Sequence, residues 1–266
     1  MEVLNNKIGS YKFKPAASES KGVIVFIHGF ATNSDYHDSV AEKFVNYDYY
    51  AFELPGHGYT NIDSKNKINI NTLFVNFCLS MIKKLKLDNF FLIGHSMGGS
   101  IAMRIANKIK SKVQKLILVT PMNSSITLKT LSCFFIFNPK NFNKTLALNN
   151  VLYKDLTKTI NLDVENYISN EHMYQVKHIK FFKKLKYKMF SLTNLKDCMK
   201  EERNLSTPTL LMVGEYDQTI PYKAAIRSIK RSNKPFIQVA IFTNSAHLPF
   251  KEEPEKYLKD VIDFIE

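Results

Sequence analysis

Short apolar stretches alternate with longer amphipathic ones through most of the chain. Six of the short stretches are dense in apolar residues, as buried strands are: residues 22–27, 49–54, 90–93, 115–120, 209–213 and 236–242. Helices are predicted between and after them, at residues 72–87, 97–109, 221–231 and 254–264. Strands that alternate with helices join through right-handed crossovers into a mostly parallel sheet. The pattern therefore predicts an α/β fold in which helices flank a central sheet.

The alternation stops between residues 122 and 205, where no clear strand is found. This segment contains Asn-rich turns and helical stretches, among them residues 175–190. Because it interrupts an otherwise regular pattern, we interpret it as a helical insertion and not as an independent domain. The predicted division is a core of residues 1–121 and 206–266 with an inserted helical cap of residues 122–205.

The chain is strongly basic, with a formal net charge of +13 over 266 residues. Lysine far exceeds arginine and tryptophan is absent, a pattern that AT-rich codons produce without selection for function. The segment 122–205 holds fourteen Lys and Arg against seven Asp and Glu, concentrated at residues 177–188. No base-stacking motif or basic arm accompanies the charge, so we expect no nucleic-acid partner.

Cysteine usage and hydropathy point to the cytoplasm. Cys78, Cys133 and Cys198 are far apart and odd in number, so they form neither a disulfide framework nor a metal motif. We expect each to be a small buried apolar residue in a reducing compartment. The first residues do not have the form of a secretory signal, and no apolar stretch reaches the ~18 residues of a membrane-spanning helix.

Residues 94–98 read Gly-His-Ser-Met-Gly and carry the strongest chemical signal. A bare G-x-S-x-G pattern is weak, but here it follows the predicted strand 90–93 and begins the helix 97–109. That strand–turn–helix context is what a nucleophile elbow requires, since its sharp turn exposes the serine at the carboxyl edge of the sheet. The helix N-terminus beside Ser96 favours developing negative charge. Ser96 is the predicted nucleophile.

A serine nucleophile needs a base, and three histidines follow Ser96 in the chain. His247 comes after the last predicted strand, in a short loop before the final helix. His172 and His178 fall in the insertion, away from strand ends, and we expect them to be solvated helix residues. His247 is therefore the predicted base, in the chain order of nucleophile, acid and base that this fold uses.

The acid that orients the base should follow an intervening strand. Asp217 stands in Gly-Glu-Tyr-Asp-Gln-Thr-Ile-Pro, directly after the strand 209–213 and ahead of a helix that Pro221 can begin. Glu215 is its local rival, and a turn or cap aspartate is the plain structural alternative. We favour Asp217 as the catalytic acid.

An oxyanion hole requires two backbone N–H donors. One is expected from Met97, which follows the nucleophile, and the other from Phe30, in the loop after the first core strand. His28 and His57 fall in tight turns after strands and are interpreted as structural hydrogen-bonding residues. His95 lies beside the nucleophile, where packing is its expected role.

Five motifs together resemble the α/β-hydrolase superfamily over nearly the whole chain. They are H-G-F at 28–30, L-P-G-H-G at 54–58, G-H-S-M-G at 94–98, G-E-Y-D-Q-T-I-P at 214–221 and A-H-L-P-F-K-E-E-P-E at 246–255. Within it, the chain is most similar to small bacterial esterase/lipase proteins of the monoacylglycerol-lipase-like or lysophospholipase-like kind. The resemblance implies an α/β-hydrolase fold with a variable helical cap, and hydrolysis of carboxylic esters of small or medium acyl chains without metal or organic cofactor.

Other activities occur in the same superfamily. Ser96 argues against the dehalogenases and epoxide hydrolases that resemble this fold, since these use aspartate. Proline iminopeptidases typically carry Gly-Gly-Ser-Trp-Gly at the elbow, whereas this chain has His95 and Met97. An acyl thioesterase remains an alternative, because the same acyl-enzyme chemistry serves both leaving groups. From another class, a non-catalytic ligand-binding protein on the same scaffold is the rival hypothesis.

The expected partner is a small-molecule acyl ester, whose shape the insertion would set. The predicted substrate contacts are Phe30, His95, Phe134, Phe135 and Leu248. The dense apolar stretch 131–137 forms either an acyl pocket or a lipid-contacting surface, or simply the core of the cap. The stretch 175–190 is a basic amphipathic helix, which can lie weakly on an anionic membrane or can present a solvated outer face. The sequence does not give the oligomeric state.

Overall fold

The computed structural model describes residues 1–62, 69–125, 127–138, 140–160, 163–231 and 234–266. Its strands form one eight-stranded sheet in the order β1-β2-β4-β3-β5-β6-β7-β8. The strands are β1 (Glu2–Asn5), β2 (Ser10–Lys14), β3 (Val23–Ile27), β4 (Asp48–Phe52), β5 (Phe90–His95), β6 (Val113–Val119), β7 (Thr209–Gly214) and β8 (Ile237–Phe242). From β4 to β8 all neighbours are parallel, whereas β1 and β2 pair antiparallel at one edge. The predicted mostly parallel sheet is confirmed.

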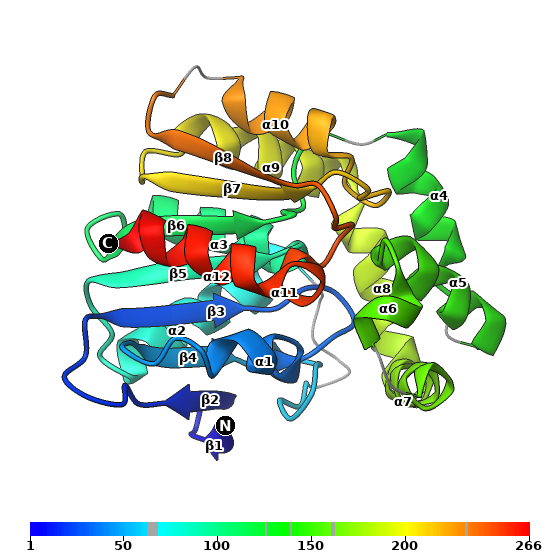
Figure 1. The fold of residues 1–266 in the computed structure, drawn as a ribbon, viewed down its shortest axis with the longest axis horizontal. Coiled ribbons are helices and arrows are strands. Elements are labelled where there is room, and N and C mark those ends of the chain that lie inside the picture. The colour runs from blue at the N-terminus through cyan, green and yellow to red at the C-terminus, as the bar shows by residue number, and fades with distance from the viewer. Residues whose placement is uncertain (63–68, 126, 139, 161–162, 232–233) are drawn as a thin grey trace.

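Both faces of the sheet are covered, because successive strand residues point to opposite sides. In β5, Phe90 and Leu92 join one core cluster while Phe91 and Ile93 join the other. One face carries α2 (Asn76–Lys84), α3 (Met97–Lys108), α9 (Leu192–Asn204) and α10 (Tyr222–Lys230). The other carries α1 (Asp38–Ala41), α11 (Pro249–Glu252) and α12 (Pro254–Ile265), which lie in front of the sheet in Figure 1. Short turns η1 (Ser34–His37) and η2 (Ile70–Val75) precede α1 and α2.

The remaining helices gather at one end of the sheet, beyond the carboxyl ends of the parallel strands (Figure 1). They are α4 (Leu128–Ile136), α5 (Phe142–Leu152), α6 (Leu156–Ile160), α7 (Val164–Lys177) and α8 (Ile179–Met189). All five lie between β6 and β7 in sequence, so the expected helical cap insertion is present. This placement puts the cap over the edge where α/β sheets bind ligands.

One sequence expectation needs correction. The predicted helix 175–190 is wrong as a single helix, because α7 ends at Lys177, α8 begins at Ile179 and His178 separates them. The last helix of the insertion, α9, also packs on core helices. Arg104 of α3 is fully buried and donates to Asn194 Oδ1 of α9 at 2.8 Å. The segment therefore leaves the sheet after β6, covers its end and returns to it before β7.

Candidate active site

Ser96 lies at the turn between β5 and α3, with φ 53° and ψ −119°. Few non-glycine residues adopt a positive φ, so this strained backbone is a feature that the surrounding packing maintains. A Cβ atom at Gly98 would lie 2.2 Å from the Ile27 carbonyl oxygen, and one at Gly94 2.5 Å from the Gly98 carbonyl oxygen. Glycine at both positions therefore allows the tight turn. Ser96 itself is partly exposed.

His247 and Asp217 meet at the carboxyl edge of the sheet, close to the ends of β7 and β8. Asp217 Oδ2 lies 2.7 Å from His247 Nδ1. The other oxygen, Oδ1, accepts from the N–H groups of Thr219 and Ile220, both at 2.8 Å, and from the Thr219 hydroxyl at 2.7 Å. With Asp217 held from three sides, its free oxygen fixes the tautomer of His247, with Nδ1 protonated and Nε2 left as the basic nitrogen.

The structure separates Asp217 from its sequence rival. Asp217 is 4% exposed and faces the histidine, whereas the Glu215 side chain is exposed to solvent. The Glu215 backbone N–H continues the sheet by donating to the Phe242 carbonyl oxygen at 3.0 Å. Sequence reasoning missed Thr219, whose hydroxyl oxygen also lies 2.8 Å from His247 Nδ1. Thr219 could have been found from its position, because a hydroxyl side chain two residues after an aspartate can donate to that carboxylate.

The loop after β3 passes directly against the elbow. A Cβ atom at Gly29 would lie 3.2 Å from Ser96 Cβ, so a side chain here would crowd the serine and glycine avoids that contact. Among the described residues, the backbone N–H groups of Phe30 and Met97 have no hydrogen-bond partner. Two free donors beside a serine are the arrangement that stabilises an oxyanion.

His95 holds the backbone of the histidine loop. Its Nε2–H donates to the carbonyl oxygen of His247 at 3.0 Å, and the Thr120 hydroxyl donates to the same oxygen at 3.0 Å. Burial lowers the pKa of His95 well below the usual histidine value, so the ring stays neutral. The two bonds fix the position of His247 relative to the elbow.

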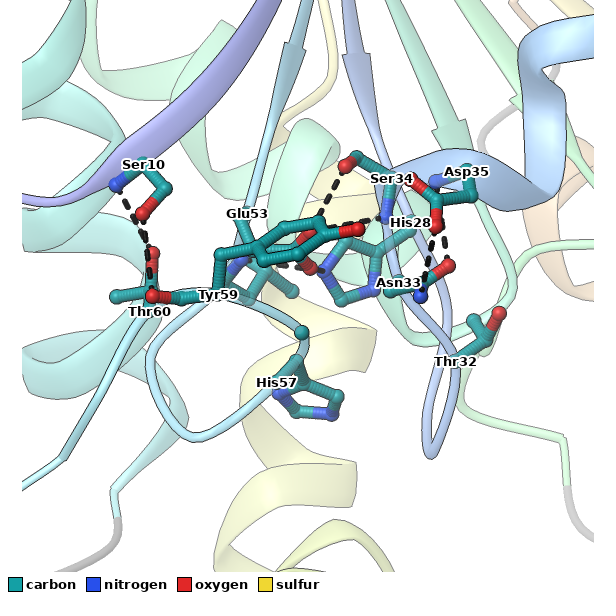
Figure 2. A network of polar contacts seen from close by, with 12 residues as sticks. Ser10, His28, Thr32, Asn33, Ser34, Asp35, Glu53, His57, Tyr59 and Thr60 are labelled. Atoms are coloured by element: carbon teal, nitrogen blue, oxygen red, sulfur yellow. Dashed lines mark hydrogen bonds and ion pairs between the residues drawn. The ribbon is translucent and has the colours of Figure 1, made fainter. Parts of the chain in front are cut away.

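A second buried network supports the loop that carries Phe30 (Figure 2). His28 Nδ1–H donates to the Gly29 carbonyl oxygen at 2.9 Å, and the Leu54 N–H donates to His28 Nε2 at 3.1 Å. Glu53 is fully buried, with Oε1 3.1 Å from His28 Nε2, and its Oε2 accepts from the Ser34 hydroxyl at 2.7 Å. The loop is thereby tied at both ends to the end of β4. Sequence reasoning missed Glu53.

The cap is bonded to the same loop through one phenol. Tyr174 of α7 accepts from the Gly58 N–H at 2.9 Å and donates to the Thr32 carbonyl oxygen at 3.0 Å. Beside it, His178 packs between Tyr174 and Phe182, with ring centres 4.9 and 5.5 Å away. His178 is thus half-buried and not solvated as expected.

The other histidine of the cap needs the same correction. His172 is half-buried, with Nδ1 3.0 Å from the Thr145 hydroxyl oxygen and its ring centre 5.5 Å from that of Phe142. His57 is fully buried and bonded to the Pro55 carbonyl oxygen at 3.2 Å, as a structural histidine would be. Neither ring lines the cavity at Ser96.

A cavity of about 150 Å³ lies between the sheet edge and the cap. Ser96 and His247 line it, together with three of the predicted substrate contacts, Phe30, His95 and Leu248. Within the part of the chain that the structure describes, no group accepts a hydrogen bond from the Ser96 hydroxyl, which is therefore open to a ligand.

The stretch 131–137 reaches this cavity through other residues than predicted. Cys133 and Phe137 line the cavity, and burial raises the pKa of the Cys133 thiol. Phe135 does not line it, because α4 turns 74% of this side chain toward solvent. The side chain of Phe134, also a predicted contact, lies outside the described residues.

The described ranges hold neither a cluster of metal-ligating side chains nor a helix able to span a membrane. Among the residues that the structure describes, no group of three or more His, Cys, Asp or Glu side chains could hold a metal ion. None of the helices in the described ranges has the length and apolar character needed to cross a bilayer.

Comparison with known proteins gives the family. The family described as serine aminopeptidase, S33, matches residues 18–254. The chain belongs to this α/β-hydrolase family. A Mycoplasma pneumoniae relative named as an esterase/lipase is 30% identical over 95% of this chain and 90% of its own length. A Mycoplasma genitalium relative with the same name is 31% identical over the same shares of both chains.

Solved structures of α/β hydrolases superpose on nearly the whole chain. A protein described as a lipase from Acinetobacter baumannii has a TM-score of 0.85 at 20% identity, covering 99% of this chain and 90% of that one. An esterase from Exiguobacterium antarcticum has a TM-score of 0.77 at 19% identity, covering 97% and 96%. At this identity the likeness establishes the α/β-hydrolase fold and nothing finer.

Proposed function

We propose that this α/β hydrolase cleaves carboxylic esters through an acyl-enzyme formed on Ser96. The observation that carries the proposal is the 2.7 Å contact between Asp217 Oδ2 and His247 Nδ1, at the cavity that also exposes the elbow serine. A ligand-binding protein on this scaffold would need none of the three groups in this order. Close relatives named as esterase/lipases support the ester as the bond that is cleaved.

Acylation begins when a substrate carbonyl carbon lies against Ser96 Oγ. His247 Nε2 takes the hydroxyl proton as Oγ attacks, and Asp217 stabilises the imidazolium that forms. The N–H groups of Phe30 and Met97 donate to the oxyanion of the tetrahedral intermediate, aided by the N-terminus of α3. The intermediate then collapses, and the leaving alcohol receives its proton from His247.

Deacylation repeats these steps with water. His247 Nε2 takes a proton from a water molecule, whose oxygen attacks the acyl carbon of the ester on Ser96. Collapse of the second intermediate returns a proton to Ser96 Oγ and releases the carboxylic acid. Apart from the substrate and water, neither half requires a group outside the chain.

The apolar part of the cavity is the proposed acyl site. Met122, Cys133, Met189, Phe190 and Leu195 line it, from the end of β6 and from the helices of the insertion. We propose that residues 122–205 act as the cap over a core of residues 1–121 and 206–266. The modest cavity volume fits small or medium acyl chains.

Active-site labelling tests the proposal directly. A fluorophosphonate probe should label the wild-type protein, and Ser96→Ala should remove the label. Hydrolysis of p-nitrophenyl esters of graded chain length, run beside acyl-CoA, then separates an esterase from a thioesterase. Absence of Ser96-dependent labelling would contradict the enzyme, and faster turnover of acyl-CoA would contradict the ester.

The cap also offers a surface for weak contact with an anionic membrane. Leu128, Leu131 and Phe135 share one exposed face of α4, at 86%, 36% and 74% exposure. Exposed lysines follow α7 and α8 at helical spacing, at positions 177, 180, 184 and 188. Exposed apolar side chains and exposed lysines on the cap favour an anionic lipid surface. Flotation with phosphatidylglycerol vesicles at low salt should carry the protein up, and sedimentation away from the vesicles would exclude the contact.

We propose a cytoplasmic location for the enzyme. Cys78, Cys133 and Cys198 are all free thiols and all buried, as expected in a reducing compartment. Cell fractionation with an antibody against the chain tests the location, and recovery from the culture medium would contradict it.

A further inference from the structure

The loop that carries the base is bonded to the cap as well as to the core. The backbone N–H of His247 donates to the carbonyl oxygen of Leu152, the last residue of α5, at 2.9 Å. Two residues later in the cap, the Lys154 ammonium group donates to Asn244 Oδ1 at 2.9 Å. The position of His247 therefore depends on the cap turn, residues 152–155, and not on the sheet alone.

One carboxylate joins the histidine loop to the cap turn. Glu252 of α11 accepts the backbone N–H of Ala246 on Oε2 at 2.7 Å, and the backbone N–H of Lys154 on Oε1 at 2.6 Å. Ala246 directly precedes the base, and Lys154 lies between α5 and α6. The two oxygens of a single side chain thus hold both segments at once.

This double contact needs a carboxylate. Each carboxylate oxygen accepts, whereas a carboxamide has one accepting oxygen and an NH₂ group that only donates. Burial raises the pKa of Glu252, and bonds from the backbone N–H groups of Ala246, Lys154 and Asp155 oppose that rise. An amide at this position would leave at least one backbone N–H without its acceptor.

The next residue supports the same loop from the core side only. Glu253 Oε2 accepts the Asn244 N–H at 2.9 Å and the Ser245 hydroxyl at 2.6 Å, and neither partner belongs to the cap. The loop therefore keeps two of its bonds when Glu252 is changed. Loss of Glu252 should shift the base without unfolding the segment that carries it.

A small shift of the base is costly because His247 acts twice in acylation. It takes the proton of Ser96 Oγ and then gives it to the leaving alcohol, so Nε2 must come within about 2.6–3.2 Å of each oxygen. A displacement of about 1 Å can lower the rate on the order of 100-fold.

We propose that Glu252 is a positioning residue for the base, and that through it the placement of His247 depends on the cap turn. The proposal rests on the ester hydrolysis proposed above and adds a residue on which that reaction depends. The cap then does more than form one wall of the cavity, because its turn is part of the support of the base. If the cap turn moves away from the core, the bonds at Leu152 and Glu252 are lost together.

Two octanoate esters separate positioning from loss of folded protein. p-Nitrophenolate leaves as the anion, whereas the alcohol of ethyl octanoate needs a proton from His247. In Glu252→Gln, kcat/KM should therefore fall about 100-fold for the ethyl ester but only about tenfold for the p-nitrophenyl ester. A smaller amount of active protein lowers both values by one factor, so equal losses for the two esters would overturn the proposal.

The matched control is Glu255→Gln, which changes an exposed carboxylate of the same segment. It should keep the wild-type kcat/KM for both esters, because its side chain bonds neither the histidine loop nor the cap. A loss in this control as large as that in Glu252→Gln would overturn the assignment to Glu252.

The cap side of the contact is tested at Lys154. Lys154→Pro removes the N–H that Glu252 accepts, and Tyr153 before it already has the extended backbone, φ −109° and ψ 145°, that a following proline requires. Lys154→Ala keeps the N–H and removes only the side chain. The proline variant alone should show the larger loss on the ethyl ester, and the same ratio of losses in both variants would overturn the link to the cap.

The two proposals fail in different ways. If ester hydrolysis itself is wrong, the wild type cleaves neither ester and the fluorophosphonate probe does not label Ser96. If only the positioning role is wrong, the wild type is labelled and cleaves both esters, and Glu252→Gln lowers both rates equally or not at all. Circular dichroism shows whether each variant is folded, and a misfolded Glu252→Gln is replaced by Glu252→Asp, whose shorter side chain cannot bond both N–H groups.

Discussion

The two walls of the cavity are built in opposite ways. On the core wall, every group beside Ser96 is held: Asp217 by three donors, and the carbonyl oxygen of His247 by His95 and Thr120. On the cap wall, Glu171 and Gln175 face the same space with no protein partner in the described chain. The core wall is thus held by bonds within the protein, while the cap wall presents polar groups to the cavity.

This contrast follows from how each wall is anchored. The core side chains stand at strand ends, where the parallel sheet fixes their backbones. The cap touches this frame at a few places, such as Tyr174 with Thr32 and Gly58, and His247 with Leu152. Substitutions on the core wall should therefore stop the chemistry, whereas those on the cap wall should change selectivity, stability or the fit between the walls.

The largest expected effect is at the nucleophile. Ser96→Ala should lower kcat by about 10⁶-fold, and adding His247→Ala should cost little more, because the triad acts as one unit. Steady-state hydrolysis of a p-nitrophenyl ester measures both. Ser132→Ala, an exposed serine on α4, is the control and should keep full activity. Losses that multiply in the double variant would show that the two residues act separately.

The acid should give the next largest effect. Asp217→Asn should lower kcat by about 10⁴-fold, because the amide favours the wrong tautomer of His247. Glu215→Gln, the matched variant of the rival acid, should leave kcat unchanged, since that side chain is exposed. The same ester assay measures both variants. A larger loss at Glu215 than at Asp217 would reverse the assignment.

Much of the core wall could be predicted from the sequence, because its residues stand next to elements with strong local patterns. Ser96, Asp217 and His247 each come within a few residues of the end of a predicted strand, and their order along the chain is the one this fold uses. The two edge strands β1 and β2 were not predicted. They pair antiparallel beyond β4. In β2 the buried positions include the polar residues Ser10 and Lys12, so the sequence lacks the alternation of apolar and polar residues that predicts a strand.

The cap wall could not be predicted, because its contacts join residues far apart in the sequence. Glu171 and Gln175 look like ordinary polar positions of a surface helix, and only the placement of α7 turns them inward. The break at His178 is likewise set by packing against Tyr174 and Phe182, not by a glycine or proline. Phe135 was predicted to contact the substrate because it lies in a dense apolar stretch, but it stands on the exposed face of α4.

The bond between the walls gives a smaller, measurable effect. Tyr174→Phe leaves the Gly58 N–H and the Thr32 carbonyl group without their partner, which should lower the free energy of unfolding by about 2 kcal/mol. Thr32 follows Phe30 in the same loop, so loss of this bond should misalign the Phe30 N–H, one of the two proposed oxyanion donors. We therefore expect kcat to fall about tenfold with little change in KM. Urea unfolding and ester kinetics measure the two effects.

The control for this bond is Tyr59→Phe, an exposed tyrosine beside Gly58, which should change neither quantity. A stability loss in Tyr174→Phe without a fall in kcat would mean that the phenol supports the cap but does not position the loop. Unchanged stability would mean that the hydroxyl is replaced by water.

The smallest expected effect is a pH dependence that belongs to the cap wall. Burial raises the pKa of Glu171 from 4.5 to about 7 in the folded protein, with Lys251 of α11 as the opposing charge. The folded state therefore holds a proton that the unfolded chain has lost, so stability from this group falls as pH rises from about 4.5 to about 7. The fall is at most about 3 kcal/mol, and solvent screening reduces it because Glu171 is only half-buried. Urea unfolding at a series of pH values should show a shallower fall in Glu171→Gln than in the wild type. Glu165→Gln, exposed on the same helix, should retain the wild-type slope, and parallel slopes in all three proteins would place Glu171 in contact with solvent.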